Sequence, residues 1–259
     1  MDREQFENRP GRFRTLRGMD TKDLKPLISA LENGYRYRNH EMLGFFLSAT
    51  MSLWGLPEWQ SVPEDVQPKI AEAIDAYADI VAAQPPFMDV LGPLYMELGS
   101  RGARAQLGQY FTPWPIAEMM ATISAGRPMP ESNGLIRACD PASGSGVMML
   151  AFASEILTSH GPEGLLRLSV TGCDLDPYCA RMFAVQAVAN CNVHNVQLGE
   201  CVVYRGNSLG PWEDLDVIIH ATAPSVVKEP PAFSPDRLAA LASAARSHPD
   251  VMQLELFAA

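Results

Sequence analysis

A short glycine-rich turn is the part of the sequence with the clearest chemistry. It reads DPASGSG at residues 140–146, between an apolar run and a helical pattern. Small residues let such a turn pass close beneath a ligand, and the following helix offers unpaired N–H groups. Phosphate and dinucleotide sites use the same device. However, no lysine follows Gly146, and Asp140 would repel a pyrophosphate, so the turn favours a cationic ligand.

Two carboxylates follow the next apolar run, in the sequence GCDLDP at residues 172–177. Nucleoside-binding α/β folds hold ribose hydroxyls with an acid at the tip of the second strand. Either acid would also suit the N-cap of a helix that starts near Pro177. We expect Asp174 to face a ribose and Asp176 to cap the helix.

Upstream, the sequence GQYFTP at residues 108–113 predicts a turn that leads into a helix. Thr112 is a favourable N-cap residue, and Pro113 suits the first helical position because its missing N–H would have no partner there. On its own, this pattern indicates only the start of a helix.

These motifs lie in a region where short apolar runs alternate with helical stretches. The expected strands cover residues 135–139, 168–173, 201–204 and 215–219, and the expected helices cover residues 147–157 and 178–189. Such alternation predicts a parallel, doubly wound sheet with helices on both faces. The expected fold class is therefore α/β.

Residues from about 20 to 100 have a helical pattern instead. In residues 64–83, apolar side chains recur at three- and four-residue steps and form one face: Val66, Ile70, Ile74, Tyr77 and Val81. Further helices are expected at residues 41–54, 88–98 and 234–247. We therefore divide the chain into a helical N-terminal region (1–105), an α/β domain (106–232) and a C-terminal helix and tail (233–259).

The three motifs GQYFTP, DPASGSG and GCDLDP, in this order, resemble those of the methylation subunits of type I restriction–modification systems and related N6-adenine DNA methyltransferases. The resemblance covers roughly residues 88–220 and implies a Rossmann-like methyltransferase domain that binds S-adenosylmethionine. It implies cofactor contacts from Tyr110, Phe111, Thr112 and Pro113 at the methionine end, from Asp140, Ala142, Ser143, Gly144 and Gly146 in the cradle, and from Asp174 at the ribose. Asn207 stands where the family has an acid that contacts the adenine, and an amide can still donate and accept there.

The resemblance fails at the motif that grips the target base. In the family, a strand leads into Asn/Asp-Pro-Pro-Tyr/Phe, whose first side chain holds the amino group of a flipped adenine and whose ring stacks on the base. Here the strand at residues 215–219 is followed by HATAPS. The motif maps to Ala221, Thr222, Ala223 and Pro224, or to the same pattern one residue further. Neither register offers the amide, acid or ring, so the motif is degenerate. His220 is either a substitute base or a structural residue, and the second is favoured.

The sequence QLELF at residues 253–257 closely resembles the pentapeptide by which bacterial polymerases and repair proteins dock on the replicative sliding clamp. In such docking, Leu254, Leu256 and Phe257 would fill an apolar cleft while Gln253 would form a hydrogen bond at its rim. The alternative is an amphipathic terminus that folds back on the core.

The charge distribution bears on DNA as a partner. The chain carries −10 overall, but residues 1–40 hold nine Lys/Arg against six acids, which leaves −13 for the remainder. Because proteins bind the phosphate backbone with Lys and Arg, the basic N-terminal segment or a partner subunit would supply most of the attraction. The alternative for this segment is a solvated tail of mixed charge.

The composition excludes several classes of protein. With 47% hydrophobic and 19% charged residues, the chain can form a core and is not a disordered protein. No apolar run approaches the ~20 residues of a membrane span, and the N-terminus lacks a secretory signal, so we expect a cytoplasmic protein without membrane contact. Five cysteines without a CxxC pair indicate buried free thiols and argue against zinc.

Three functions fit these observations. The first is a protein of DNA modification or restriction–modification that binds S-adenosylmethionine and is either catalytically degenerate or dependent on a partner subunit. The second is an active adenine methyltransferase with an unusual fourth motif. The third is an interaction module that docks on the sliding clamp and keeps a vestigial cofactor pocket. We take the first as the main hypothesis.

Overall fold

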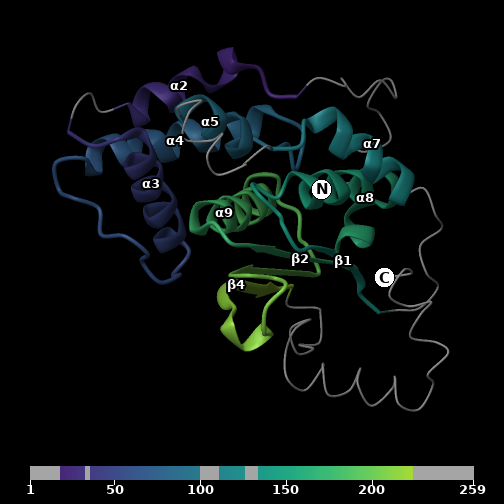
Figure 1. Ribbon diagram of the computed structural model, residues 1–259. Coiled ribbons are helices and arrows are strands. Elements are labelled where there is room, and N and C mark those ends of the chain that lie inside the picture. Colours follow the sequence, from purple (N-terminus) through teal and green to yellow (C-terminus); the bar gives the residue numbers. More distant parts are fainter. Residues whose placement is uncertain (1–17, 33–35, 100–110, 126–133, 224–259) are drawn as a thin grey trace.

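The computed structural model describes residues 18–32, 36–99, 111–125 and 134–223, which form a mixed α/β fold (Figure 1). The helices are α2 (Thr21–Leu31), α3 (Asn39–Leu53), α4 (Gln67–Ala83), α5 (Leu91–Leu98), α7 (Trp114–Ala125), α8 (Val147–Leu165) and α9 (Pro177–Val193), with a short 3-10 helix, η1 (Trp212–Asp214). The strands are β1 (Ile136–Asp140), β2 (Leu168–Asp174), β3 (Glu200–Arg205) and β4 (Asp216–Thr222). Each expected strand and each expected helix inside the described ranges is therefore present, within a few residues of its predicted bounds except at the end of α8, which lies eight residues beyond the predicted residue 157.

The four strands form one sheet in the order β1-β2-β3-β4. The pairs β1–β2 and β2–β3 are parallel, so Asp140 lies beside Gly172 and Asp174 beside Arg205. The pair β3–β4 is antiparallel, with Arg205 beside Asp216 and Glu200 beside Thr222. The prediction of an all-parallel sheet is therefore wrong for the last strand. Because β4 runs antiparallel, its carboxyl end lies beside the amino end of β3, at the edge of the sheet opposite to the one formed by the carboxyl ends of β1 and β2.

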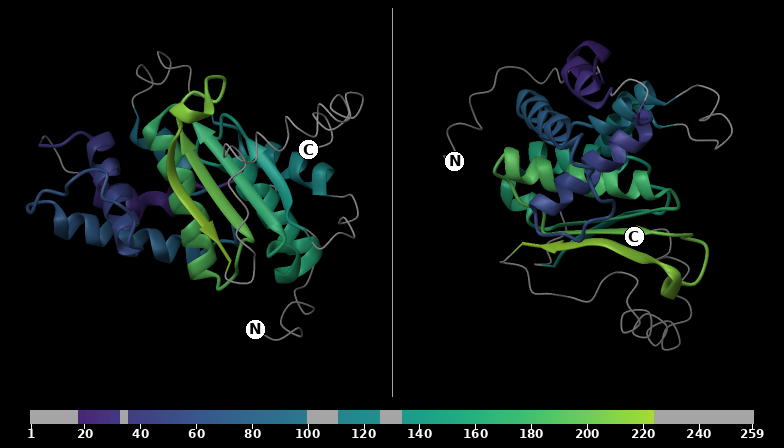
Figure 2. Two further views of the ribbon diagram at one scale, coloured as in Figure 1. Left: turned by 90° about the horizontal axis from the view of Figure 1, so that it is seen from below. Right: turned by 90° about the vertical axis from the view of Figure 1, so that its left-hand side faces the viewer.

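Both crossover helices, α8 and α9, lie on the same face of the sheet (Figures 1 and 2). The expected arrangement, with helices on both faces, is not found in the described part of the chain. The strand order explains the difference. From β1 to β3 the chain moves across the sheet in one direction, and two right-handed crossovers in one direction put both helices on one face.

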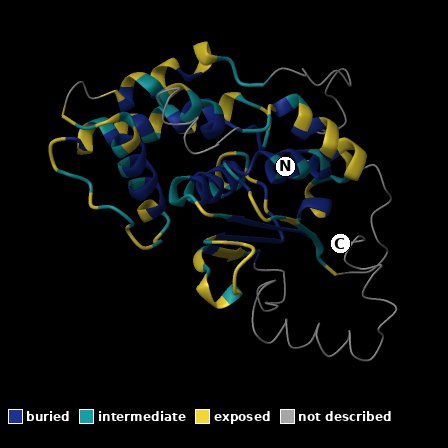
Figure 3. Cartoon of the chain, viewed as in Figure 1, coloured by how far each residue is buried: buried dark blue, intermediate teal, exposed yellow. Residues whose placement is uncertain are grey.

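Helix α9 lies between the sheet and the N-terminal helices and belongs to two apolar clusters. Its inner side, which includes Phe183 and Ala187, packs with α7, α8 and the strands. Its outer side, which includes Met182 and Val185, packs with α2, α3, α4 and α5. Figure 3 shows the strands β2 and β3 and much of α9 as the buried centre of the molecule. The N-terminal helices therefore pack against the α/β unit, and the predicted boundary near residue 105 lies outside the described residues.

Helix α4 shows how the apolar periodicity positions the N-terminal helices. Val66, Ile70, Tyr77 and Val81 are buried as expected, while Ile74 is half-buried. The helix begins at Gln67 rather than at residue 64, and Pro68 occupies its first turn, where no intrahelical N–H is needed.

Helix α7 differs because it is apolar on both sides. Trp114, Ala117 and Ala121 are buried against α8, and a stripe of exposed side chains lies on the other side: Ile116, Met119, Met120 and Ile123. The sequence of α7 therefore does not indicate by itself which side packs inward.

All five cysteines are free, and Cys173, Cys179 and Cys201 are buried as expected, whereas Cys139 is exposed on the edge strand. No group of His, Cys, Asp and Glu in the described ranges has the arrangement of a metal site. None of the described helices is long and apolar enough to cross a membrane.

Candidate functional site

The turn of residues 140–146 connects the carboxyl end of β1 to the first residue of α8. Gly144 and Gly146 have φ angles of 53° and 90°, in the left-handed region that residues with a Cβ rarely adopt. A Cβ on Gly144 would also meet the Phe111 ring at 2.9 Å. The glycines are therefore required both for the backbone conformation and for the close approach of an aromatic ring.

A second aromatic ring supports the turn from α9. Phe183 is 1% exposed, and a Cβ on either Gly146 or Gly172 of β2 would overlap its ring. The ring thus fills the space that two glycines leave open, one in the turn and one in the neighbouring strand. The sequence analysis missed Phe183, because an apolar residue within a helical pattern carries no signal of its partner.

Hydrogen bonds fix the turn against the end of β2. The Ser143 N–H donates to the Cys173 carbonyl at 2.9 Å, and the Gly144 N–H donates to Asp174 Oδ2 at 2.8 Å. The other carboxylate oxygen of Asp174 accepts from the Asp176 N–H at 2.9 Å. Asp174 therefore holds the turn in place, while each of its oxygens keeps a free lone pair for a further donor.

Asp176 caps α9, as predicted. Its Oδ1 accepts from the Tyr178 N–H at 2.8 Å, and Pro177 takes the first helical position. Its Oδ2 lies 3.5 Å from the Tyr95 hydroxyl oxygen. The helix start and α5 thus meet at this carboxylate.

Two of the acids at this edge of the sheet, Asp140 and Asp174, have raised pKa values. Burial raises the pKa of Asp140, although a hydrogen bond from the Ala142 N–H at 3.1 Å opposes that shift. Burial is also the main cause of the raised pKa of Asp174, and the nearby charges of Asp176 and Asp140 add to it. A cation at this edge would stabilise the charged carboxylates.

The upstream motif reaches the same site. The ring of Phe111 contacts Gly144 and makes an edge-to-face contact with Tyr95, with 5.5 Å between ring centroids. Helix α7 begins at Trp114, and the Pro113 carbonyl accepts from the Ile116 N–H at 2.9 Å. Pro113 thus precedes the helix, so the prediction of Thr112 as N-cap is wrong by one residue. The second proline of this segment, Pro115, lies in the first turn of the helix, where a backbone N–H has no intrahelical acceptor.

Asn207 lies just beyond β3, at the same edge of the sheet as Asp174. The Gly206 N–H donates to the Asp174 carbonyl at 2.9 Å, which brings the two strand ends together. Asn207 itself is exposed, and its Oδ1 accepts from the Leu209 N–H at 3.1 Å. Its amide therefore shapes the local turn and stays accessible from solvent.

A buried polar network that the sequence analysis missed lies beneath the turn. Asp89 is 4% exposed and accepts from the Ser145 hydroxyl at 3.1 Å and from the Gln186 amide at 2.8 Å. The same amide nitrogen of Gln186 donates to the Ser145 carbonyl at 2.9 Å, and its oxygen accepts from the Val90 N–H at 2.7 Å. The network joins the start of α5, the glycine turn and α9. A lone acid within the apolar stretch FMDVLG was the signal available in the sequence.

The residues that the resemblance aligns with the base-binding motif do not lie at this site. Thr222 pairs with Glu200 at the start of β3, whereas Asp174 pairs with Arg205 at its end. At about 3.3 Å per residue, the five steps along β3 separate the two edges by roughly 17 Å. Ala221 and Ala223 share the distant edge with Thr222, and Pro224 lies outside the described residues.

His220 is a structural residue in this arrangement. Its Nε2 lies 3.0 Å from Glu200 Oε1, and the Ser169 hydroxyl donates to the other oxygen of Glu200 at 2.6 Å. Glu200 is buried, so the histidine and the serine satisfy a carboxylate that would otherwise lack partners. His220 does not reach the edge that carries Asp140 and Asp174.

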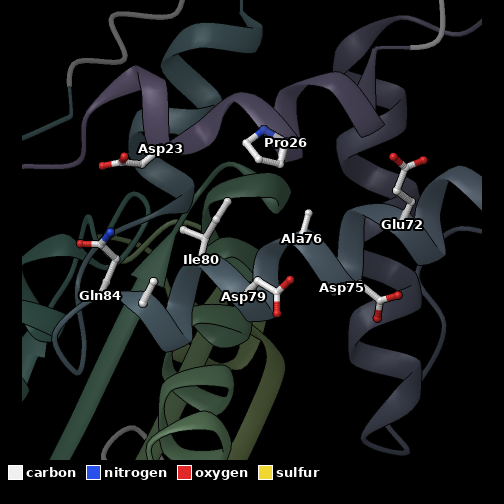
Figure 4. A pocket seen from close by; sticks show the side chains of 9 residues that line it. Asp23, Pro26, Glu72, Asp75, Ala76, Asp79, Ile80 and Gln84 are labelled. Carbon is white, nitrogen blue, oxygen red and sulfur yellow. The ribbon is translucent and has the colours of Figure 1, made fainter.

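A cavity of about 450 Å³ lies elsewhere, between α2 and α4 (Figure 4). Its rim carries the carboxylates Asp23, Glu72, Asp75 and Asp79. This acidic surface would repel a phosphate backbone, which makes it unfavourable for DNA binding.

Other predicted site residues lie outside the described part of the chain. These are Tyr110, and the tail residues Gln253, Leu254, Leu256 and Phe257. Their roles stay predictions.

Comparison with known proteins identifies one family. Residues 87–237, which are more than half of the chain, match a family model described as N-6 DNA methylase. The matched range contains the glycine turn, the acids at the end of β2 and the buried Asp89. No curated protein matches the chain, and no solved structure matches it.

Proposed function

We propose that this chain, which belongs to the N-6 DNA methylase family, binds S-adenosylmethionine over the turn of residues 140–146 and takes part in adenine methylation of DNA with a partner subunit. The observation that carries the proposal is the turn itself. Gly144 and Gly146 have left-handed φ angles, and the Gly144 N–H donates to the Asp174 carboxylate. The backbone of the turn and this carboxylate therefore lie together at the carboxyl ends of the strands, where α/β folds bind nucleosides.

The residues present fit this cofactor. A Cβ-free cradle exists at Gly144, and the buried Ser143 hydroxyl has no hydrogen-bond partner within the described ranges. Asp174 keeps acceptor capacity for ribose hydroxyls, and Asp140 adds negative charge for a sulfonium. When bound, S-adenosylmethionine supplies an activated methyl group. The chain's own residues would hold and orient it beside the Phe111 ring, which packs against Gly144.

The missing base-gripping motif supports dependence on a partner. An adenine amine is a weak nucleophile, and a flipped base needs groups that hold it next to the methyl donor. The residues 221–223 lie at the distant edge of the sheet and carry no amide, acid or ring. The net charge of −13 outside residues 1–40 also leaves most DNA binding to the N-terminal segment or to the partner. We therefore assign cofactor binding to this chain and base recognition to a partner subunit.

Calorimetry with the full chain tests the cofactor site. Wild type should bind S-adenosylmethionine, and Asp174→Ala should weaken binding by about tenfold or more, since it removes charge-assisted hydrogen bonds. Asp75→Ala, a loss of the same charge on the exposed surface of α4, serves as the matched control. No heat with wild type, or equal affinity in Asp174→Ala, would contradict the proposal.

Methyl transfer is tested separately. The chain alone should transfer no tritiated methyl group to adenine-containing DNA, and transfer should appear when the partner subunit is added. Turnover by the chain alone would show that its own residues complete the site and would refute the dependence on a partner.

The tail supports a second proposal, docking on the bacterial sliding clamp. It rests on the sequence QLELF at residues 253–257. Replacement of both Leu256 and Phe257 by alanine should abolish capture of the chain by immobilised clamp, whereas Glu255→Ala should not. Unchanged capture by the double variant would remove this proposal.

A further inference from the structure

The cavity between α2 and α4, which we call the acidic cavity, combines an apolar floor with a charged rim (Figure 4). Ile80, which is 7% exposed, lines it together with Pro26, Ala76 and Ala83. Its volume of about 450 Å³ is in the range of roughly 300–1,000 Å³ that is typical of binding pockets. The acidic cavity therefore has both the room and the apolar surface to receive side chains of a bound segment.

Four carboxylates surround this floor. Asp23 comes from α2, whereas Glu72, Asp75 and Asp79 come from α4. In the part of the chain that the structure describes, these four side chains form no hydrogen bond and no ion pair. The lining of the cavity contains no Lys or Arg. Its charge is therefore uncompensated and favours a cationic occupant.

The three acids of α4 also repel one another. Glu72 and Asp75 are three residues apart, and Asp75 and Asp79 are four residues apart, so each is the neighbour of the next on one face of the helix. Like charges at these spacings destabilise a helix. A cation that binds between them replaces this repulsion with attraction.

The chain itself contains a segment of matching composition. Residues 9–17, which we call the arginine segment, read RPGRFRTLR and hold four arginines and no acid. Phe13 and Leu16 add large apolar side chains between these charges. The guanidinium group forms paired hydrogen bonds with a carboxylate, and apolar side chains suit the floor around Ile80. The arginine segment thus complements the acidic cavity in both charge and polarity.

The arginine segment is joined to the acidic cavity by a short connection. Arg17 precedes Asp23 by six residues, and α2, which forms one wall of the cavity, begins at Thr21. The wall on α4 from Glu72 to Ala83 is roughly 17 Å long at 1.5 Å per residue, and nine extended residues span about 30 Å. A short tether also gives an effective concentration in the millimolar range, so weak contacts are sufficient for docking.

We propose that the acidic cavity binds the arginine segment of the same chain, with the arginines on the carboxylates of α2 and α4 and the apolar side chains over Ile80. The docked arginines are then unavailable to a phosphate backbone, because they cannot pair with both sets of anions at once. The acidic cavity therefore competes with DNA for the arginine segment. The docking stands on the cavity and the segment alone, and only this competition rests on the proposed function.

Trypsin digestion of the full chain tests the docking without DNA. Cleavage of a docked segment follows the population of its released form, so the bonds after Arg12, Arg14 and Arg17 should be cut slowly in wild type. The variant E72Q/D75N/D79N removes the charges of α4 and should speed these cuts by about 3- to 30-fold, as expected for the loss of several exposed ion pairs. Equal rates in this variant and in wild type would overturn the proposal.

A matched control separates the cavity from the net charge. The variant E58Q/E213Q/D214N neutralises three exposed acids that do not line the acidic cavity. It should keep the slow cleavage of wild type. The same acceleration in both triple variants would assign the effect to net charge and overturn the docking.

A charge exchange tests direct contact. D75R/D79R should release the arginine segment, and addition of R12E/R14E should restore slow cleavage after Arg17, because opposite charges then face each other again. The fourfold variant has the net charge of wild type, so its rate depends on where the charges lie. Fast cleavage after Arg17 in the fourfold variant would overturn the docking.

Dilution distinguishes the chain's own segment from that of a second copy. Protection within one chain should not change when the protein is strongly diluted. Protection that is lost on dilution would assign the occupant to a second copy and overturn the proposal.

Fluorescence anisotropy with a labelled DNA duplex tests the competition. E72Q/D75N/D79N should bind the duplex more tightly than E58Q/E213Q/D214N, although both variants lose three negative charges. Equal affinities would refute the competition. If neither variant binds the duplex, DNA binding belongs to the partner subunit, the competition is refuted, and the trypsin rates alone decide the docking.

Discussion

Asp174 Oδ2 accepts a hydrogen bond of 2.8 Å from the backbone N–H of Gly144, which lies thirty residues earlier in the chain. This contact connects the end of β2 to the turn after β1, so the two motifs that the sequence separates form one structure. It also means that Asp174 has a structural role before any ligand arrives. Substitution of Asp174 therefore changes the shape of the cradle as well as its charge.

Gly144→Ala should destabilise the protein by about 2–4 kcal/mol, because the left-handed φ costs roughly 1–2 kcal/mol and the new methyl group would press on the Phe111 ring. Urea unfolding measures the change. Gly55→Ala is the matched control, since Gly55 has a φ of 74° and no atom lies within 4 Å of its ideal Cβ. Equal losses in the two variants would show that Phe111 does not press on the turn.

The pair Gly172 and Phe183 provides a test of packing beneath the turn. Gly172→Ala should cost about 1–3 kcal/mol, because its Cβ would overlap the Phe183 ring. Phe183→Leu should also destabilise, by creating a cavity. In the double variant the added methyl group would partly fill that cavity, so the double loss should be smaller than the sum of the single losses. Additive losses in urea unfolding would contradict this contact.

The sequence predicted the elements better than their arrangement. Apolar periodicity located β1, β2 and β3 to within a few residues, because alternation and helical spacing are local properties. It did not show the direction of β4. The length of the connection indicates this direction. Ten residues, 206–215, separate β3 from β4, whereas a parallel crossover needs a dozen or more residues and usually contains a helix. The short connection therefore favours an antiparallel β4.

The site was predicted in part for a similar reason. Gly144, Gly146 and Asp174 belong to motifs whose spacing is visible in the sequence. Asp89 contacts residues 56 and 97 positions away, and a single sequence does not show such pairs. Long-range polar contacts depend on how the helices pack, and that packing follows from shape rather than from local pattern.

His220 lies away from the carboxyl ends of β1 and β2, so its substitution should lower the stability of the protein without changing its affinity for the ligand. His220→Ala should destabilise the protein by about 1–3 kcal/mol, because it removes a partner from the buried Glu200. Its affinity for S-adenosylmethionine in calorimetry should equal that of wild type. A loss of affinity in a variant that stays folded would instead place His220 in the cofactor site.

Asp89 predicts a dependence of stability on pH. Its folded-state pKa lies above the ordinary value of 3.8, so the native state binds protons that the unfolded state has released. The free energy of unfolding that Asp89 contributes is therefore fully present below pH 3.8 and is lost as the pH rises through the folded-state pKa.

Measured against Asp89→Asn, wild type should gain stability as the pH falls from about 7 towards 4. Urea unfolding of both proteins across this range gives the difference. The exposed variant Asp75→Asn serves as a reference for a change of one surface charge. A difference between wild type and Asp89→Asn that stays constant with pH would show that Asp89 has the same pKa in both states.

Asn207 offers a gain-of-function test of the resemblance. A carboxylate at this position would restore the acid that the family uses for the adenine. Asn207→Asp should therefore bind S-adenosylhomocysteine more tightly, by about 3- to 10-fold, through a charge-assisted hydrogen bond to the adenine amine. The local turn should persist, since a carboxylate can still accept from the Leu209 N–H. Asn195→Asp makes the same charge change at the end of α9 and should leave affinity unchanged. Calorimetry that finds no gain in Asn207→Asp would place the adenine away from the end of β3.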